Sequence, residues 1–281
     1  MKRRMKKQLP KIATMGCALV FCVAGTGYLL WESMGKITAD SYGCFSHVYA
    51  PQTIVLVDAS EPRWNETQAR ALHTYFENLY QQLGFNERLS VFTTEGDQIS
   101  SVPAPRFHIC GQARNANELS DIGAPDASEG YLRKQKQRLF KNVFKPQLDA
   151  LLAFLPDESR RQTSQSPILE FIRSVSRLTK PEQGDSLVVI SDAIQNSESL
   201  KFCRVKDDMP TFNKIKQRRI YQERLKPETL SGVNVSFLML MRGGYGQQGL
   251  EYCYSEEELR GVWRDYFIDN GVSTPEFIRI R

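Results

Sequence analysis

The sequence predicts an α/β sandwich in which helices cover both faces of a mostly parallel central sheet. Two segments far apart in the chain, Thr53–Ser60 and Ser186–Asp192, are runs of Val, Ile and Leu that end in a small polar loop. Such unbroken runs are typical of strands that are buried on both faces. Helical patterns separate the strand-like segments, which indicates right-handed crossovers between parallel strands. The expected fold class is therefore a Rossmann-like three-layer sandwich.

The first half of the domain is predicted to hold three strands and one helix. Apolar residues recur at helical spacing from Trp64 to Leu83, and Gly84 ends that helix. Between Gly111 and Gly130 the composition shifts to small and polar residues, which predicts a surface loop. The predicted strands of this half are Thr53–Val57, Arg88–Thr94 and Arg106–Cys110.

The second half is predicted to hold three helices. Tyr131–Leu155 is one long helix, in which Pro146 predicts a kink or break near Lys145. Ser166–Pro167 begins the next helix, with Ser as the cap and Pro as the first residue. Ser255 and Glu258 form a capping box that begins a helix ending at Ile268. The buried stripe of the middle helix is predicted to be Ile168, Ile172, Val175 and Leu178.

Three more strands are predicted in this half. They are Ser186–Ser191, Asn234–Met241 and Phe277–Ile280, the last at an edge of the sheet. With 41% hydrophobic and 25% charged residues, the chain has the composition of a folded globular protein. We therefore expect residues 53–281 to form one α/β domain.

The amino terminus is predicted to anchor the chain in a membrane. Residues 12–31 contain no charged residue, and twenty helical residues at 1.5 Å each span a bilayer core. The six Lys and Arg residues in 1–11 predict a basic tail that stays in the cytoplasm. A cleaved signal peptide is the alternative, but the apolar run is longer than usual and Ile37–Ala39 is a poor cleavage site. Residues 32–52 are then a tether between the transmembrane helix and the domain.

The charge distribution argues against a nucleic-acid partner. The net charge of +5 comes from residues 1–11, because the rest of the chain is nearly balanced between acidic and basic residues. We therefore expect no direct contact with nucleic acid. Two segments rich in Lys and Arg, Arg133–Lys145 and Lys214–Lys226, are expected to be solvated faces. The alternative for them is contact with anionic headgroups or an acidic partner near the membrane.

Four cysteines would lie outside the cytoplasm if residues 32–281 are exported, and they would then meet an oxidising compartment. They are Cys44, Cys110, Cys203 and Cys253. The sequence leaves all three pairings open. Cys110 and Cys203 each follow a predicted strand, so they could meet at one end of the sheet and leave Cys44 to pair with Cys253. Four buried or free thiols are the other alternative.

A candidate site is predicted where the strands end, because ligands of open α/β sheets bind at the carboxyl ends of the strands. Asp58 and Asp192 follow the two apolar strands and are expected to share this site. Each could instead accept backbone N–H groups as the cap of the helix that follows. Hydroxyl groups also precede the middle helix, at Thr163, Ser164 and Ser166.

This order of motifs resembles von Willebrand factor A (vWA-like) domains. The resemblance implies that Asp58, Ser60, Ser166 and Asp192 hold Mg²⁺ or another divalent cation, a type of ion that prefers oxygen ligands. Pro62 departs from the family pattern, since it stands where a third hydroxyl is expected. The implied metal site is therefore degenerate.

The likeness extends to a membrane-anchored bacterial branch of the fold, through Ser166–Glu170, Ser191–Ser197 and Trp263–Phe267. It implies a single-pass protein of the bacterial inner membrane with a cytoplasmic amino terminus and a periplasmic domain. Residues 12–31 would contact the lipid bilayer. The expected function is a protein–protein interaction module, with protein partners in a membrane-associated assembly such as a mobile-element, secretion or conjugation system.

The chain is not expected to be an enzyme, and no catalytic residue is predicted. The sequence contains no G-x-S-x-G, H-E-x-x-H or P-loop motif. A metal-dependent phosphohydrolase that uses Asp58 is the enzyme alternative, although Ser60 stands where a second aspartate would be wanted. The remaining alternative is a purely structural subunit with a vestigial site.

Overall fold

A computed structural model describes residues 37–59, 64–94, 104–153, 165–202, 211–241 and 255–281. They contain a six-stranded sheet in the order β3-β2-β1-β4-β5-β6. The strands are β1 (Gln52–Val57), β2 (Arg88–Thr93), β3 (Phe107–Cys110), β4 (Ser186–Ser191), β5 (Asn234–Leu240) and β6 (Glu276–Ile280). All neighbouring strands are parallel except β2 and β3, which are antiparallel. The predicted α/β fold with a mostly parallel sheet is thus confirmed.

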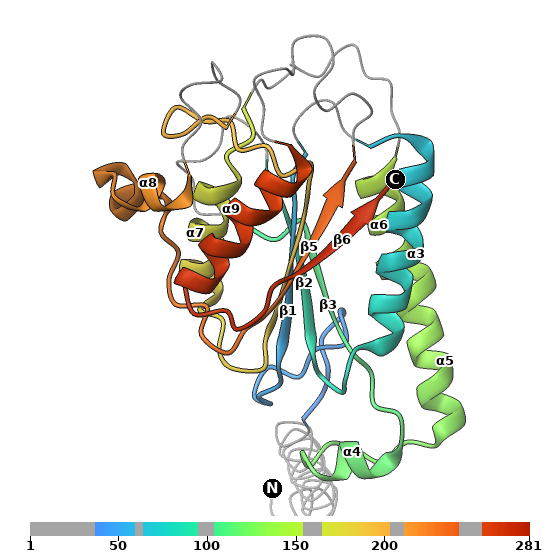
Figure 1. Cartoon of the computed structure of the whole chain (residues 1–281). Helices are drawn as coiled ribbons and strands as arrows, with labels where there is room; N and C mark the ends of the chain where they lie inside the picture. Colours follow the sequence, from blue (N-terminus) through green and yellow to red (C-terminus); the bar gives the residue numbers. More distant parts are fainter. Residues whose placement is uncertain (1–36, 60–63, 95–103, 154–164, 203–210, 242–254) are drawn as a thin grey trace, which may run out of the picture.

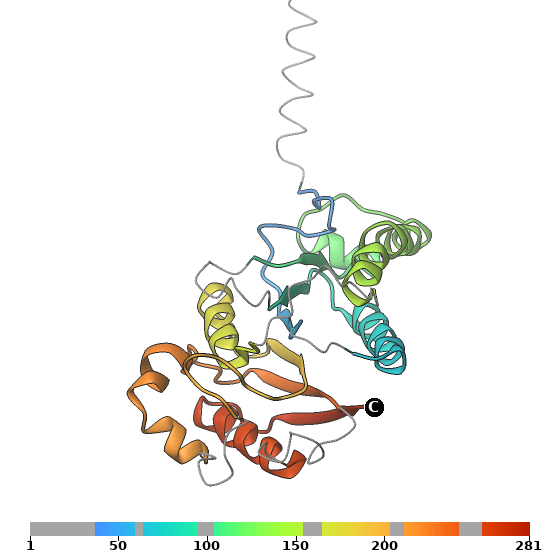
Figure 2. The same cartoon turned by 90° about the horizontal axis from the view of Figure 1, so that it is seen from above.

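Helices cover both faces of the sheet (Figures 1 and 2). One layer holds α3 (Glu66–Gln82), α5 (Glu129–Leu139) and α6 (Lys145–Leu152). The other holds α7 (Ile168–Thr179), α8 (Phe212–Lys216) and α9 (Glu256–Asp269). Side chains alternate between the faces along a strand, so Val55 and Val57 pack in one core cluster while Ile54 and Leu56 pack in the other. Both faces of β1 are therefore buried, which explains why every residue from Ile54 to Val57 is apolar.

The long helix predicted for Tyr131–Leu155 is three consecutive segments. Between α5 and α6 lies η1 (Phe140–Phe144), a wider π-helical turn. Pro146 sits in the first turn of α6. Because Pro lacks an N–H and its ring crowds the carbonyl four residues before it, the helix changes its hydrogen bonding just ahead of it. The break predicted near Lys145 lies at that junction.

Three predictions about helices were wrong. The helix predicted to begin at Ser166–Pro167 is α7, which begins at Ile168 with Pro167 in the cap position, and the Ser166 side chain does not cap it. The loop predicted for Gly111–Gly130 contains α4 (Ala116–Ser120), which the Asn115 side chain caps by accepting from the Glu118 N–H. Leu178, predicted to be buried, is 44% exposed. The buried side of α7 also includes Leu169 and Ser176, so its centre is rotated away from Leu178.

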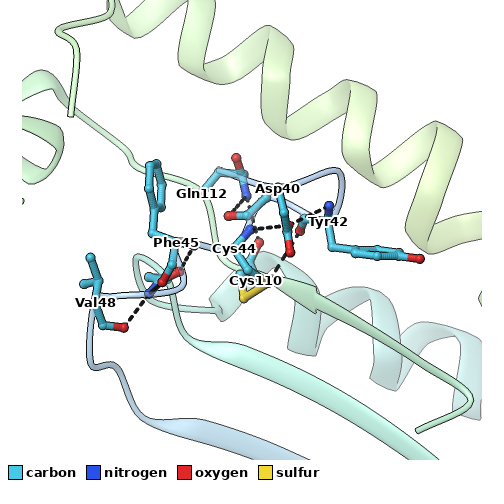
Figure 3. Close-up of a disulfide and its surroundings, with 9 residues drawn as sticks. Asp40, Tyr42, Cys44, Phe45, Val48, Cys110 and Gln112 are labelled. Carbon is cyan, nitrogen blue, oxygen red and sulfur yellow. Dashed lines mark hydrogen bonds between the residues drawn. A yellow bond between two sulfur atoms is a disulfide. The ribbon is translucent and has the colours of Figure 1, made fainter. Parts of the chain in front are cut away.

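A disulfide joins Cys44 to Cys110, across 66 residues of sequence (Figure 3). The suggested pairing of Cys110 with Cys203 was therefore wrong, and so was the pairing of Cys44 with Cys253. Because β3 is antiparallel, Cys110 lies opposite Arg88, at the start of β2, far from the end of β4. Cys203 and Cys253 lie outside the described residues.

The segment before β1 is held against the sheet, although the sequence predicted only a tether there. The buried Asn86 side chain accepts from the Phe45 N–H at 2.8 Å and donates to the Phe45 and Val48 carbonyls at 3.1 and 2.8 Å. The predicted basic tail and transmembrane helix, residues 1–31, lie outside the described residues. Within the part of the chain that is described, no helix is long and apolar enough to cross a membrane.

Candidate functional site

The Asp58 carboxylate is the centre of a buried cluster at the carboxyl ends of the strands. Its Oδ2 accepts the Ser166 hydroxyl at 2.6 Å and the Ser191 hydroxyl at 2.8 Å. Its Oδ1 accepts the Thr94 hydroxyl at 3.1 Å. Asp58 is only 7% exposed, so these hydroxyl groups replace the water that a free carboxylate would bind. Three separate segments of the chain thus meet on one side chain.

The parallel sheet explains why these residues meet. Thr94 and Asp58 each follow directly on a strand, β2 and β1, and Ser191 is the last residue of β4. The ladder continues past the strand ends, because the Asp58 N–H donates to the Ile190 carbonyl at 2.8 Å and the Thr94 N–H to the Val57 carbonyl at 3.0 Å. Neighbouring parallel strands end at the same edge, so their next side chains converge.

Ser166 reaches the cluster through a second set of contacts. Its N–H and carbonyl bond to the carbonyl and N–H of Asn196, at 2.7 and 2.8 Å. The loop that carries Asn196 is fixed in turn by buried Glu170, which accepts from the Gln195 amide at 2.9 Å and the Ser197 hydroxyl at 2.6 Å. Because Glu170 lies in the first turn of α7, these bonds hold the loop between Asp192 and Leu200 against the start of that helix.

Asp192 lies beside Ser191 and is 4% exposed. Its Oδ1 accepts the Ile194 N–H at 2.9 Å and lies 3.5 Å from the Ser191 Oγ. Ala193 has a left-handed φ of 66°, and its carbonyl accepts the indole N–H of Trp263 at 2.9 Å. A residue with a Cβ is strained at such a φ. Asp192 thus accepts a backbone N–H of a tight turn. The alternative in which it caps the helix that follows was wrong, because no helix begins between Asp192 and Phe202.

The structure therefore brings together three of the four predicted ligands, Asp58, Ser166 and Asp192. Ser60 lies outside the described residues, as do Pro62, Thr163 and Ser164. Thr94 and Ser191 also belong to the cluster, and the sequence reasoning did not select them as ligands. Both residues lie at the carboxyl end of a parallel strand, which is the same feature that predicted Asp58.

The donor set fits a hard divalent cation. The side chains gathered here are carboxylates and hydroxyls, and oxygen atoms are the ligands that Mg²⁺ and Ca²⁺ prefer. Asp58 accepts the protons of the Ser166 and Ser191 hydroxyls, so lone pairs of those oxygens remain for a cation. Binding of a metal by these residues stays a prediction.

A second group of potential ligands lies at the opposite end of the sheet. Ligand atoms of Asp40, Cys44 and His108 all lie within 4.8 Å of one another. The Cys44 sulfur is in the disulfide and offers no thiolate, so only two ligands remain. Burial and then the Arg88 charge lower the pKa of His108 below 6.5, while Asp40 opposes them. We do not assign a metal to this group.

Comparison with known proteins gives likeness in fold only. No protein-family model and no curated protein sequence matches the chain. The crystal structure of the ArnB paralog VWA2 from Sulfolobus acidocaldarius matches 83% of this chain with 10% identity and a TM-score of 0.40. The conserved hypothetical protein BatB from Bacteroides thetaiotaomicron matches 82% with 13% identity and a TM-score of 0.34.

These two matches differ in how much of the other protein they span. This chain spans 42% of the length of the Sulfolobus protein and 90% of BatB. The six-stranded, mostly parallel sheet between two helical layers agrees with the α/β sandwich that the resemblance to vWA-like domains implies.

Proposed function

We propose that this chain is a membrane-anchored protein–protein interaction module whose partner binds at the Asp58–Asp192 edge of the sheet. The observation that carries the proposal is the convergence of Thr94, Ser166 and Ser191 on the Asp58 carboxylate, beside Asp192. Such a built polar cluster at the carboxyl ends of parallel strands is where ligands of this class of sheet bind.

A divalent cation held by Asp58, Ser166, Ser191 and Asp192 would supply positive charge for a carboxylate of the partner. The chain's own part is to hold the oxygens in place. Asp58 orients the two serine hydroxyls, and the Glu170 network fixes the loop that follows Asp192. Preorganised donors of this kind lower the cost of binding.

We infer that the edge binds rather than catalyses. Both oxygens of Asp58 accept hydroxyl protons, which weakens the carboxylate as a nucleophile. A phosphohydrolase that attacks through Asp58 would have to break these bonds first. The proposed role is therefore adhesion to a protein partner in a membrane-associated assembly of the secretion, conjugation or mobile-element type.

We further propose that the domain lies on the periplasmic side of a bacterial inner membrane, with residues 12–31 as the anchor. The Cys44–Cys110 disulfide supports an oxidising compartment. Cys110 lies opposite Arg88, at the amino-terminal end of the parallel strands, whereas Asp58 directly follows the carboxyl end of β1. The described chain begins near the amino-terminal end of these strands (Figure 1). The Asp58–Asp192 edge therefore lies at the end of the sheet opposite the start of the described chain.

Metal titration of the full chain in lipid nanodiscs tests the proposal. We expect Mg²⁺ and Mn²⁺ to give a heat of binding that is lost in Asp58→Asn and in Asp192→Asn, because the amide keeps the shape and removes the charge. Asp185→Asn is the matched control. Asp185 is also buried and also accepts N–H donors, from Gln52 and Glu182, but at the opposite end of β4.

Three results would contradict the proposal. Absence of heat from the unmodified chain at millimolar metal would leave the purely structural subunit. Equal binding by Asp58→Asn and Asp192→Asn would place the metal elsewhere. Hydrolysis of p-nitrophenyl phosphate by the chain with Mg²⁺, lost in Asp58→Asn, would favour the phosphohydrolase.

A further inference from the structure

A pocket lies at the end of the sheet opposite Asp58, away from the candidate site described above. Its volume is about 560 Å³, within the range of pockets that bind ligands. One wall is the segment from Ile37 to Phe45, and the other runs from Gln112 to Gln135 through α4 and the start of α5. Both walls belong to the end of the molecule where the described chain begins (Figure 1).

The two walls are fixed to each other, so the pocket is preformed. The Cys44–Cys110 disulfide joins the first wall to β3, directly before the second wall. The Gln112 amide donates to the Gly43 carbonyl at 3.2 Å and to the Cys110 carbonyl at 2.9 Å (Figure 3). Gly43 has φ +78°, a conformation that strains other residues, and a Cβ there would lie 2.0 Å from the Gln112 Nε2 and displace its amide.

The floor of the pocket is apolar and its exposed lining is acidic. Lining residues that belong to one buried apolar cluster form the floor: Phe45, Ala113, Leu119, Ala124 and Leu132. Asp40 and Asp126 are exposed lining residues, and the lining includes no Lys or Arg. Asp126 has no ion-pair partner among the described residues.

Two basic side chains next to lining residues in the sequence bond to backbone carbonyls instead of to these carboxylates. Lys136 donates to the Gln81 carbonyl at 3.0 Å, and Arg114 lies 3.5 and 3.4 Å from the Gln82 and Leu83 carbonyls. Tyr131 also lines the pocket and is 60% exposed. Exposed tyrosines beside apolar pockets are typical of the residues that dominate protein–protein interfaces.

We propose that this pocket binds a peptide segment of a partner protein, in which a large apolar side chain stands beside Lys or Arg. The apolar side chain enters the floor, and the basic group pairs with Asp126 and Asp40. A lipid phosphate would meet the same two carboxylates and be repelled, which favours a basic peptide over a headgroup. The site is separate from the Asp58–Asp192 edge, and the inference does not depend on the function proposed for that edge.

The pocket's position adds a constraint on the partner. Five residues lie between Trp31, the end of the predicted transmembrane helix, and Ile37, which lines the pocket. A fully extended chain covers roughly 3.5 Å per residue, so the pocket lies within about 20 Å of the membrane surface. With the anchor proposed above, on which this constraint rests, we expect the bound segment to be the juxtamembrane part of another membrane protein.

Fluorescence anisotropy with three labelled peptides tests the proposal on the full chain in nanodiscs. The probes share one length and carry the cores Lys-Phe-Lys, Lys-Ala-Lys and Glu-Phe-Glu. We expect only the first to bind. Ala127→Trp, which fills the pocket, should weaken it about tenfold, as for loss of a hot spot. Asp126→Asn should weaken it about threefold, as for loss of an exposed ion pair.

Two controls separate this pocket from other effects. Ala150→Trp adds the same side chain at an exposed position of α6 and should leave peptide binding unchanged. Asp58→Asn should also leave it unchanged, so failure of the metal-site proposal and failure of this one can be told apart. Equal binding of the three peptides, displacement by a fatty acid, or no binding at millimolar concentration would each overturn the inference.

Discussion

The Cys44–Cys110 disulfide yields a prediction whose size follows from the structure. The bond closes a loop of 66 residues that contains β1, α3, β2 and β3. In the chain-entropy account, removing such a cross-link from the unfolded chain restores roughly 15 cal/mol/K, which is about 4 kcal/mol at 25 °C. Replacing both cysteines, Cys44→Ala with Cys110→Ala, should lower the free energy of unfolding by that amount. For a domain of this size it corresponds to a loss of roughly 8–16 °C in Tm.

Thermal unfolding of the full chain in nanodiscs, followed by circular dichroism, measures this loss. Ser46→Ala is the control, because it removes one exposed hydroxyl group from the same segment and should leave Tm unchanged. A loss of less than about 2 °C would refute the reasoning, since it would mean that the cross-link does not restrict the unfolded chain. A second expectation follows from the pocket walls. The double variant should also bind the Lys-Phe-Lys peptide more weakly, because the disulfide no longer holds the Ile37–Phe45 wall of the pocket in place.

Three further predictions concern single residues. Asn86→Ala should lower the free energy of unfolding, measured in urea, by about 3 kcal/mol, because the Phe45 N–H and the Phe45 and Val48 carbonyls lose their hydrogen-bond partner. A decrease of less than about 1 kcal/mol would contradict this. Arg88→Gln should raise the His108 pKa in an NMR titration. Because folding lowers that pKa below 6.5, the His108 contribution to stability is complete above pH 6.5 and lost as the pH falls below it; an unchanged pKa would contradict the assigned cause. Ser255→Ala should cost about 1 kcal/mol by removing the α9 cap, and should raise the Glu258 pKa, which the Ser255 backbone and hydroxyl bonds now lower.

The sequence pattern predicted the strands well because they are buried on both faces. All six predicted strands are present. The sequence did not predict the exact ends of the strands or the antiparallel direction of β3. The direction of β3 could have been inferred. A parallel crossover needs a dozen or more residues that usually form a helix, and the residues between Thr94 and Arg106 carry no helical pattern. Overlooking this led to the wrong disulfide pairing, since it placed Cys110 at the wrong end of the sheet.

The site was predicted in part for the same reason. Strand ends located Asp58 and Asp192, and the family pattern added Ser166. Thr94 and Ser191 were missed because they are not acidic. Hydroxyl groups at the carboxyl ends of parallel strands converge in the same way as carboxylates do, so the pattern could have predicted them too. Short helices such as α4 could not be predicted, because five residues are too few to be helical alone. Leu119 of α4 packs in the cluster of Phe45 and Leu132, a contact between distant segments that local sequence does not encode.

The direction of β1 has a mechanical consequence. The strand runs from the segment that is tied to the sheet at Cys44 directly to Asp58, so a pull between the amino-terminal end and Asp58 acts along its axis. Parallel neighbours, β2 and β4, flank it on both sides in continuous register. Traction in this direction shears both ladders at once instead of unzipping them bond by bond. The covalent link to Cys110 also passes part of the force into β3, so the fold resists extension between its amino-terminal end and Asp58.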